Sequence, residues 1–424
     1  MDDLAQDLAD FIADAPTPYH AVAEAVRRLG AAGFTEQSES EPWADGPGGR
    51  YLVRDGTFAA WYVPGSARPG TPLRIMAAHT DSPTLRIKPN PDVGAAGWRQ
   101  VAVEVYGGAL WNSWLDRDLG VAGRLALYDG SVALVDVARP LLRVPQLAIH
   151  LDRQVNQGLK LDPQQHLLPI WGLGAPADGE LIEFLAAEAG VDAAEVAAHD
   201  LVVYDLAPPA RLGERFELLA APRLDNLSSV HAGLGALVAA AERVGVDDGA
   251  DVIPVLVGFD HEEIGSGSAT GASGPLLENV LTKLAGGHDA RSAAFARSRC
   301  LSVDVTHAAH PNYLHLHEPT HRTLPNRGPA LKVNANQRYA TDAPGAAAWH
   351  RACRDAGVPT QVFVGRNTVP CGSTVGPLLA TRLGIRTVDV GIPVLSMHSA
   401  RELCGVDDPA HLAAAATAFL TDPI

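Results

Sequence analysis

Apolar residues at the start of the chain recur at the spacing of a helix. The first helical pattern consists of Leu4, Leu8, Phe11 and Ile12. Two prolines interrupt it, and a second helical stretch begins at about His20 and ends at Gly30. We therefore expect two helices to open the chain.

Short apolar runs typical of buried strands follow. Residues 51–53 and 58–63 predict paired strands, and the run 73–78 ends directly before His79. Similar runs at 252–259, 300–305 and 387–390 alternate with helical stretches near 227–243, 374–383 and 408–420. This alternation predicts an α/β catalytic layer.

The pattern changes between residues 87 and 219. Segments such as 101–106 and 132–137 alternate apolar and polar positions between glycine-rich turns, which indicates strands with one buried face. We interpret 87–219 as an inserted β-rich domain. Residues 1–86 and 220–424 would then form one discontinuous catalytic domain, and a length of 424 residues agrees with two modules.

Composition narrows the class of protein. Hydrophobic residues make up 47% of the chain and charged residues 19%, which is typical of a folded enzyme and not of a disordered chain. The formal net charge of -16 is spread over both halves. It disfavours nucleic acids and anionic membranes as partners.

Three further features favour the cytoplasm. The N-terminus is acidic where a signal peptide needs a basic start, and no run of about 18 apolar residues occurs. No CxxC pair occurs among the cysteines, which suits a reducing compartment. These cysteines are Cys300, Cys353, Cys371 and Cys404.

Acidic residues and histidines stand at or just beyond the apolar runs, or at a helix start. They are His79, Asp81, Asp225, Glu262, Glu263, Asp304 and His398. In α/β sheets, ligands gather beyond the carboxyl ends of the strands, so residues far apart in sequence can meet there. A purely structural role for so many acids beside buried strands would be costly unless cations offset them.

This set matches the needs of a hydrolytic site with two metal ions. Ions about 3.5–4 Å apart need one shared carboxylate, then one carboxylate and one imidazole each. Asp225 can bridge the two ions. The remaining ligands pair as His79 with Asp304 and as Glu263 with His398.

Two acids are left for other roles. The water between the metals must lose a proton to become the attacking hydroxide. A carboxylate that binds no metal can take this proton and return it to the leaving amine, and Glu262 is free for this role of general base. Asp81, two residues beyond His79, can hold the second imidazole nitrogen and fix its tautomer.

Several segments resemble those of the aspartyl aminopeptidases, and the resemblance spans nearly the whole chain. They are AHTDSP at 78–83, DNL at 225–227, DHEEIGS at 260–266, Asp304 with His307 and HPNY at 310–313, and MHSARE at 397–402. The segment WNSWLDRDL at 111–119 lies in the inserted region and distinguishes this family from neighbouring dinuclear aminopeptidase families. The resemblance implies a three-layer α/β/α dinuclear zinc peptidase domain with an inserted β-rich dimerisation domain.

The resemblance also implies an activity and its residues. It implies two divalent ions, most simply Zn²⁺ with Co²⁺ or Mn²⁺ as alternatives, removal of N-terminal Asp or Glu from peptides, and a homododecamer. It assigns the general-base role to Glu262 and the metal-ligand roles to His79, Asp225, Glu263, Asp304 and His398. By the same resemblance, His307 and Lys332 would contact the acidic group of the substrate. Acidic specificity needs such a local cation because the net charge of -16 would otherwise repel that group. His166 would reach the active site of a neighbouring subunit.

Alternative functions stay open. A dinuclear aminopeptidase of neutral specificity, or a related deacylase, needs the same ligands. A catalytically dead scaffold is disfavoured because Glu262 is intact. The sequence also departs from some members of the family, with His261 where others have Asn and Gly267 where others have a charged residue. The role of His261 stays open.

Overall fold

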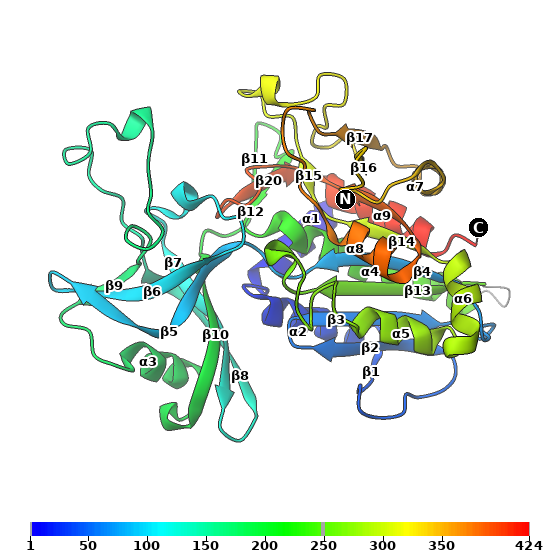
Figure 1. Ribbon diagram of the computed structural model, residues 1–424, viewed down its shortest axis with the longest axis horizontal. Coiled ribbons are helices and arrows are strands. Elements are labelled where there is room, and N and C mark those ends of the chain that lie inside the picture. The colour runs from blue at the N-terminus through cyan, green and yellow to red at the C-terminus, as the bar shows by residue number, and fades with distance from the viewer. Residues whose placement is uncertain (1, 247–250, 424) are drawn as a thin grey trace.

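The computed structural model describes residues 2–246 and 251–423. It is built around a nine-stranded sheet with a smaller sheet region beside it (Figure 1). In order across the large sheet, the strands are β1 (Thr35–Glu36), β2 (Gly48–Arg54), β3 (Thr57–Val63), β13 (Ile253–Phe259), β4 (Leu73–His79), β14 (Arg299–Val303), β18 (Arg386–Gly391), β16 (Ala330–Val333) and β17 (Gln361–Val364).

Helices cover both faces of this sheet. One face packs against α1 (Asp2–Ala13), α2 (Pro18–Ala31), α4 (Leu224–Val246), α7 (Ala343–Ala356) and α9 (Asp408–Leu420). The other face packs against α5 (Leu276–Leu284), α6 (His288–Arg297) and α8 (Val375–Leu383). Met76 of β4 belongs to the first core, whereas its neighbours Ile75 and Ala77 belong to the second. The predicted three-layer α/β/α fold is confirmed.

Strand β4 shows why the apolar runs are continuous. All of its residues are buried, because it lies between β13 and β14 with helices on both faces. The pairs β13·β4, β4·β14 and β14·β18 are all parallel. Their carboxyl ends therefore meet at one side of the domain.

A separate antiparallel sheet has six strands. Its order is β8 (Val132–Leu142), β7 (Leu119–Leu127), β10 (Val196–Asp205), β5 (Thr84–Ala95), β6 (Trp98–Tyr106) and β9 (Ile170–Leu173). Val135 and Val137 of β8 are buried while Leu134 is exposed, the alternation expected of a sheet with one covered face. Helix α3 (Glu180–Ala189) packs on the buried face.

A third sheet, of five strands, connects the regions of the nine-stranded and six-stranded sheets. Its order is β11 (Ala210–Leu212), β12 (Leu218–Ala221), β20 (Glu402–Gly405), β19 (Pro393–Leu395) and β15 (Thr306–His307). The predicted inserted region 87–219 included β11 and part of β12, yet these strands join β20 and not the six-stranded sheet. The division into domains stays a prediction, and this pairing favours a second boundary near Asp205.

Short 3-10 turns complete the described part of the chain. They are η1 (Trp111–Trp114), η2 (Val155–Gln157), η3 (Ala193–Glu195), η4 (Glu262–Ile264) and η5 (Leu314–Leu316). Within residues 2–246 and 251–423, no helix combines the length and the apolar character needed to cross a bilayer.

Candidate metal centre

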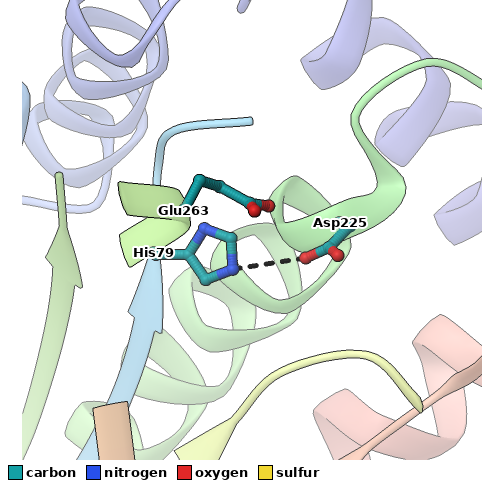
Figure 2. A group of neighbouring side chains, drawn as sticks. All are labelled: His79, Asp225 and Glu263. Carbon is teal, nitrogen blue, oxygen red and sulfur yellow. Dashed lines mark ion pairs between the residues drawn. The ribbon is translucent and has the colours of Figure 1, made fainter. Parts of the chain in front are cut away.

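The fold brings the predicted ligands together at the carboxyl ends of the parallel strands. His79 is the last residue of β4, Asp304 follows β14, and Glu263 lies in η4 just beyond β13. Asp225 stands at the start of α4, where its backbone is not yet helical, and His398 lies between β19 and β20. Figure 2 shows His79, Asp225 and Glu263 pointing toward one another from three different elements.

Asp225 lies at the centre of this cluster. Its Oδ1 is 3.2 Å from His79 Nε2, and its Oδ2 is 3.3 Å from His398 Nε2. On the first side, Asp304 Oδ1 is 3.7 Å from His79 Nε2. On the second side, Glu263 Oε2 is 3.4 Å from His398 Nε2. The two oxygens of one carboxylate thus face two different histidine and carboxylate pairs.

In their neutral form, both imidazoles would present a lone pair to these carboxylates. His79 Nδ1 lies 3.0 Å from the carbonyl oxygen of Asp81, and His398 Nδ1 lies 3.1 Å from that of Gly108. A carbonyl oxygen only accepts, so each Nδ1 carries the hydrogen. In the neutral ring, Nε2 then has no proton and faces Asp225 with a lone pair. This arrangement is the one that orients histidines toward a metal ion.

The carboxylate oxygens support the same interpretation. His79, Asp225 and Glu263 each offer a ligand atom, and these atoms lie within 4.8 Å of one another. Among the described residues, Asp225 Oδ1 and Glu263 Oε1 are buried and accept no hydrogen bond. Buried carboxylate oxygens without partners are costly, and oxygen with imidazole nitrogen is a ligand set that Zn²⁺ accepts. The residues fit a divalent cation.

The electrostatics show an excess of negative charge. Burial lowers the pKa of His398, but Asp225 and Glu402 outweigh it and raise that pKa to about 9. Burial likewise acts against protonation of His79, yet its carboxylate neighbours hold its pKa well above the usual range. Burial and the charge of Asp225 raise the pKa of Glu263. Either protons or a cation can balance such a cluster.

Glu262 stands next to the ligands on η4 and is half-buried. Burial raises its pKa to about 7, and the charges of Asp304 and Asp225 add to this, while His79 opposes it. A carboxylate with a pKa near neutrality can accept a proton and release it again.

Asp81 organises this part of the site. Its carboxylate accepts hydrogen bonds from the N–H groups of Glu262 and Glu263, both at 3.1 Å, and from the hydroxyl of Tyr106 at 2.7 Å. The sequence predicts that Asp81 holds the second imidazole nitrogen of His79. In the structure the carbonyl oxygen of Asp81 is nearer to His79 Nδ1, at 3.0 Å, than the carboxylate, at 3.4 Å.

Lys332 and His307 differ in their surroundings. Lys332 is buried, and its Nζ donates to the carbonyls of Asp304 and Val305, both at 2.8 Å, and to Asp304 Oδ2 at 3.3 Å. These contacts can use all three hydrogens of the ammonium group. The side chain of His307 is exposed on β15, with its ring 5.9 Å from that of Phe363.

The two remaining histidines lie outside the ligand cluster. His166 is exposed in the loop between β8 and β9, where its Nδ1 accepts the N–H of Asp162 at 2.9 Å. His261 adopts a left-handed backbone with φ 63°, and its Nδ1 lies 2.8 Å from Ser268 Oγ and 3.0 Å from Thr270 Oγ1. His261 therefore packs against the loop that follows it.

Sequence reasoning missed three contributors to the site. Glu402 accepts hydrogen bonds from the backbone of Asp225 and His398, and Tyr106 binds Asp81. The carbonyl of Gly108 orients His398. Glu402 closes the MHSARE segment and could have been found there, whereas a backbone carbonyl gives no signal in the sequence.

Comparison with known proteins identifies the family. The family described as Aminopeptidase I zinc metalloprotease (M18) matches residues 11–420. The Probable M18 family aminopeptidase 2 of Streptomyces coelicolor is 58% identical over 422 residues, which cover 98% of this chain and 96% of that protein.

Solved structures agree. The structure of the Ape4 and Nbr1 complex contains a chain that is 36% identical with a TM-score of 0.95, over 99% of this chain and 85% of that one. The S. cerevisiae mApe1 dodecamer is 30% identical with a TM-score of 0.86, over 99% of this chain and 96% of that one. The chain belongs to the M18 family of zinc metallo-aminopeptidases, which includes the aspartyl aminopeptidases.

Proposed function

We propose that this aminopeptidase uses two divalent metal ions to remove N-terminal Asp or Glu from peptides. The observation that carries the proposal is the position of Asp225 between two ligand pairs, with Oδ1 toward His79 and Oδ2 toward His398. A carboxylate shared in this way is what two adjacent cations need. Zn²⁺ is the first choice because of the ligand types, with Co²⁺ and Mn²⁺ as alternatives.

The residues around the ligands supply the acid and base chemistry. Divalent ions held by these ligands would lower the pKa of water to about 7 and would polarise the scissile carbonyl. Glu262 takes the proton of the attacking water and returns it to the nitrogen of the leaving amine. Asp81 keeps Glu262 in place by accepting its N–H.

Acidic specificity needs a cation near the substrate side chain. Lys332 and His307 are the proposed partners of that carboxylate. The contact of Lys332 with Asp304 Oδ2, at 3.3 Å, is the one that can be exchanged for substrate, since the other two contacts are shorter and go to backbone carbonyls.

One observation favours a second candidate, an aminopeptidase of neutral specificity. Lys332 is buried and already bound to Asp304 and Val305, so its ammonium group is largely satisfied without a substrate carboxylate. Faster cleavage of Leu-peptides than of Asp- or Glu-peptides would support this candidate.

Assembly and location complete the proposal. The similar S. cerevisiae mApe1 structure is a dodecamer, and we propose a homododecamer here, in which the exposed His166 reaches a neighbouring active site. Light scattering coupled to size exclusion measures the assembly. All four cysteines are free, which supports a cytoplasmic location.

The test measures release of the N-terminal residue from Asp-, Glu- and Leu-peptides, together with zinc content. We expect two zinc ions per chain, preference for acidic residues, loss of cleavage after chelation and recovery with zinc. One zinc ion per chain in fully active protein would contradict the two-metal mechanism. A preference for Leu would contradict the acidic specificity while leaving the metal centre in place.

A further inference from the structure

A single buried side chain holds the backbone of two proposed ligands. Glu402 Oε2 accepts the N–H of Asp225 at 2.8 Å, and Glu402 Oε1 accepts the N–H of His398 at 2.8 Å. Glu402 is only 2% exposed. Its two oxygens therefore connect two segments that lie far apart in the sequence.

The five-stranded sheet fixes Glu402 relative to both segments. Glu402 is the first residue of β20 and pairs with Ala221, the last residue of β12, shortly before Asp225. On its other side β20 pairs with β19, which ends at Leu395 shortly before His398. The strands thus bring both ligand segments to the same carboxylate.

We propose that Glu402 is a positioning residue of the metal centre, which sets the spacing between Asp225 and His398 without contacting the metal. The distance that it controls is the 3.3 Å between His398 Nε2 and Asp225 Oδ2. This inference rests on the ligands assigned in the proposed function. It adds a requirement that the ligand set alone does not contain.

The chemistry of the contact requires a carboxylate. Two N–H donors need two acceptor oxygens, and a glutamine side chain has one acceptor oxygen and one NH₂ donor. In Glu402→Gln the NH₂ group would face either the N–H of Asp225 or that of His398. One of these segments must shift, and loss of a group that orients metal ligands typically weakens metal binding by about 10- to 100-fold.

The chain offers a matched control at Asp408. Asp408 Oδ2 accepts the N–H of Asn326 at 2.8 Å, and its Oδ1 accepts the N–H of Gly328 at 3.1 Å. Asp408 is fully buried and joins two backbone groups as Glu402 does, but none of the groups it binds is a proposed ligand. Asp408→Asn therefore loses the same kind of hydrogen bond without touching the metal centre.

The experiment compares zinc affinity in wild type, E402Q and D408N by competition with a chromogenic chelator, alongside thermal unfolding of the metal-free proteins. We expect both variants to be less stable, and only E402Q to bind zinc about 10- to 100-fold more weakly. Wild-type affinity in E402Q would overturn the inference. Equal weakening in D408N would also overturn it, because a general loss of stability would then explain both.

Two further comparisons keep the test decisive. If E402Q does not fold, the variants E402D and D408E replace E402Q and D408N. The E402D side chain keeps both carboxylate oxygens but is one methylene too short to reach both N–H groups. E402D must then bind zinc more weakly than D408E does. Wild-type protein that binds no zinc would overturn the proposed metal centre itself, whereas zinc-binding wild type with unchanged E402D overturns only the role of Glu402.

Discussion

The two ends of the parallel strands carry opposite charges. At the carboxyl ends, carboxylates of Asp225 and Glu263 crowd around histidines. At the amino ends, arginines line a hollow, which is bordered by Arg74 of β4, Arg299 of β14 and Arg386 of β18. One sheet thus gathers an acidic cluster and a basic cluster on opposite sides of the domain.

The difference lies in how each cluster is balanced. Arg74 donates to the carbonyls of Asp422 at 2.7 Å and Arg297 at 3.0 Å, and Arg386 is paired with Asp342 at 2.9 Å. Burial and neighbouring arginines lower the pKa of Arg74 only to about 10, so it stays charged at neutral pH. The protein itself provides backbone carbonyls that bind the buried Arg74, whereas the acidic cluster fits an external cation.

Removal of the metal ions should have the largest effect, and it should act at the acidic, carboxyl ends of the strands. Chelation should reduce peptide cleavage to background, and restoring zinc to a thousand times its Kd should raise the free energy of unfolding by about 4 kcal/mol for each ion bound. Differential scanning calorimetry with and without zinc measures this. Phosphate or sulfate, which could bind at the arginine hollow, should not raise the free energy of unfolding by a comparable amount. An equal increase would show that both ends of the strands need an external ion.

Glu262→Gln should separate metal binding from catalysis. We expect kcat to fall by about 10²- to 10⁴-fold, because general-base catalysis contributes that much, while zinc content stays at the wild-type value. Steady-state kinetics and metal analysis of the same sample check this. Near wild-type turnover with zinc bound would rule out Glu262 as the base.

Arg74→Met should affect stability alone. The variant leaves the carbonyls of Leu73, Arg297 and Asp422 without the donor that binds them in wild type. We expect a loss of about 3 kcal/mol in urea unfolding, with zinc affinity unchanged. Weaker zinc binding would show that the two ends of the strands are not independent.

Asp260→Asn tests an acid at the carboxyl ends that is not a proposed ligand. Burial and the nearby Asp81 raise the pKa of Asp260 from 3.8 to about 7. The folded state therefore favours the protonated form, and the contribution of Asp260 to stability is lost as pH rises from about 4 to 7. Relative to wild type, D260N should gain stability over this window, by more than about 1 kcal/mol above pH 7.

The measurement is urea unfolding at pH 5 and pH 8. Zinc content should stay at the wild-type value, because Asp260 contacts the backbone N–H of His261 and is not among the ligands. A stability difference that does not change with pH would contradict the raised pKa.

The proposed ligand cluster was largely predictable because most of its residues follow an apolar run or stand at a helix start. His79 and Asp304 stand at the ends of buried runs, and parallel strands bring such ends together. The α/β layering followed from the same alternation of apolar runs and helices, whereas the division into three layers was implied by the resemblance to the aspartyl aminopeptidases. These features depend on side-chain identity and local spacing, which a sequence contains.

The contacts around the ligands were not predictable in the same way. The carbonyls of Asp81 and Gly108 orient the histidines, and any residue carries a carbonyl. The buried position of Lys332 depends on Asp304 and Val305 lying beside it in the fold. The boundary near Asp205 also depends on strand pairing between distant segments.

The connection that leaves β6 has a consequence for protein engineering. The carbonyl of Gly108 orients His398, the N–H of Leu110 binds the His398 carbonyl at 2.9 Å, and Tyr106 binds Asp81. The six-stranded sheet is therefore not an interchangeable accessory. A chimera that exchanges this sheet with that of a relative must keep residues 106–110 from the parent of the catalytic part, or it will disturb the proposed ligand His398 from outside the proposed catalytic domain.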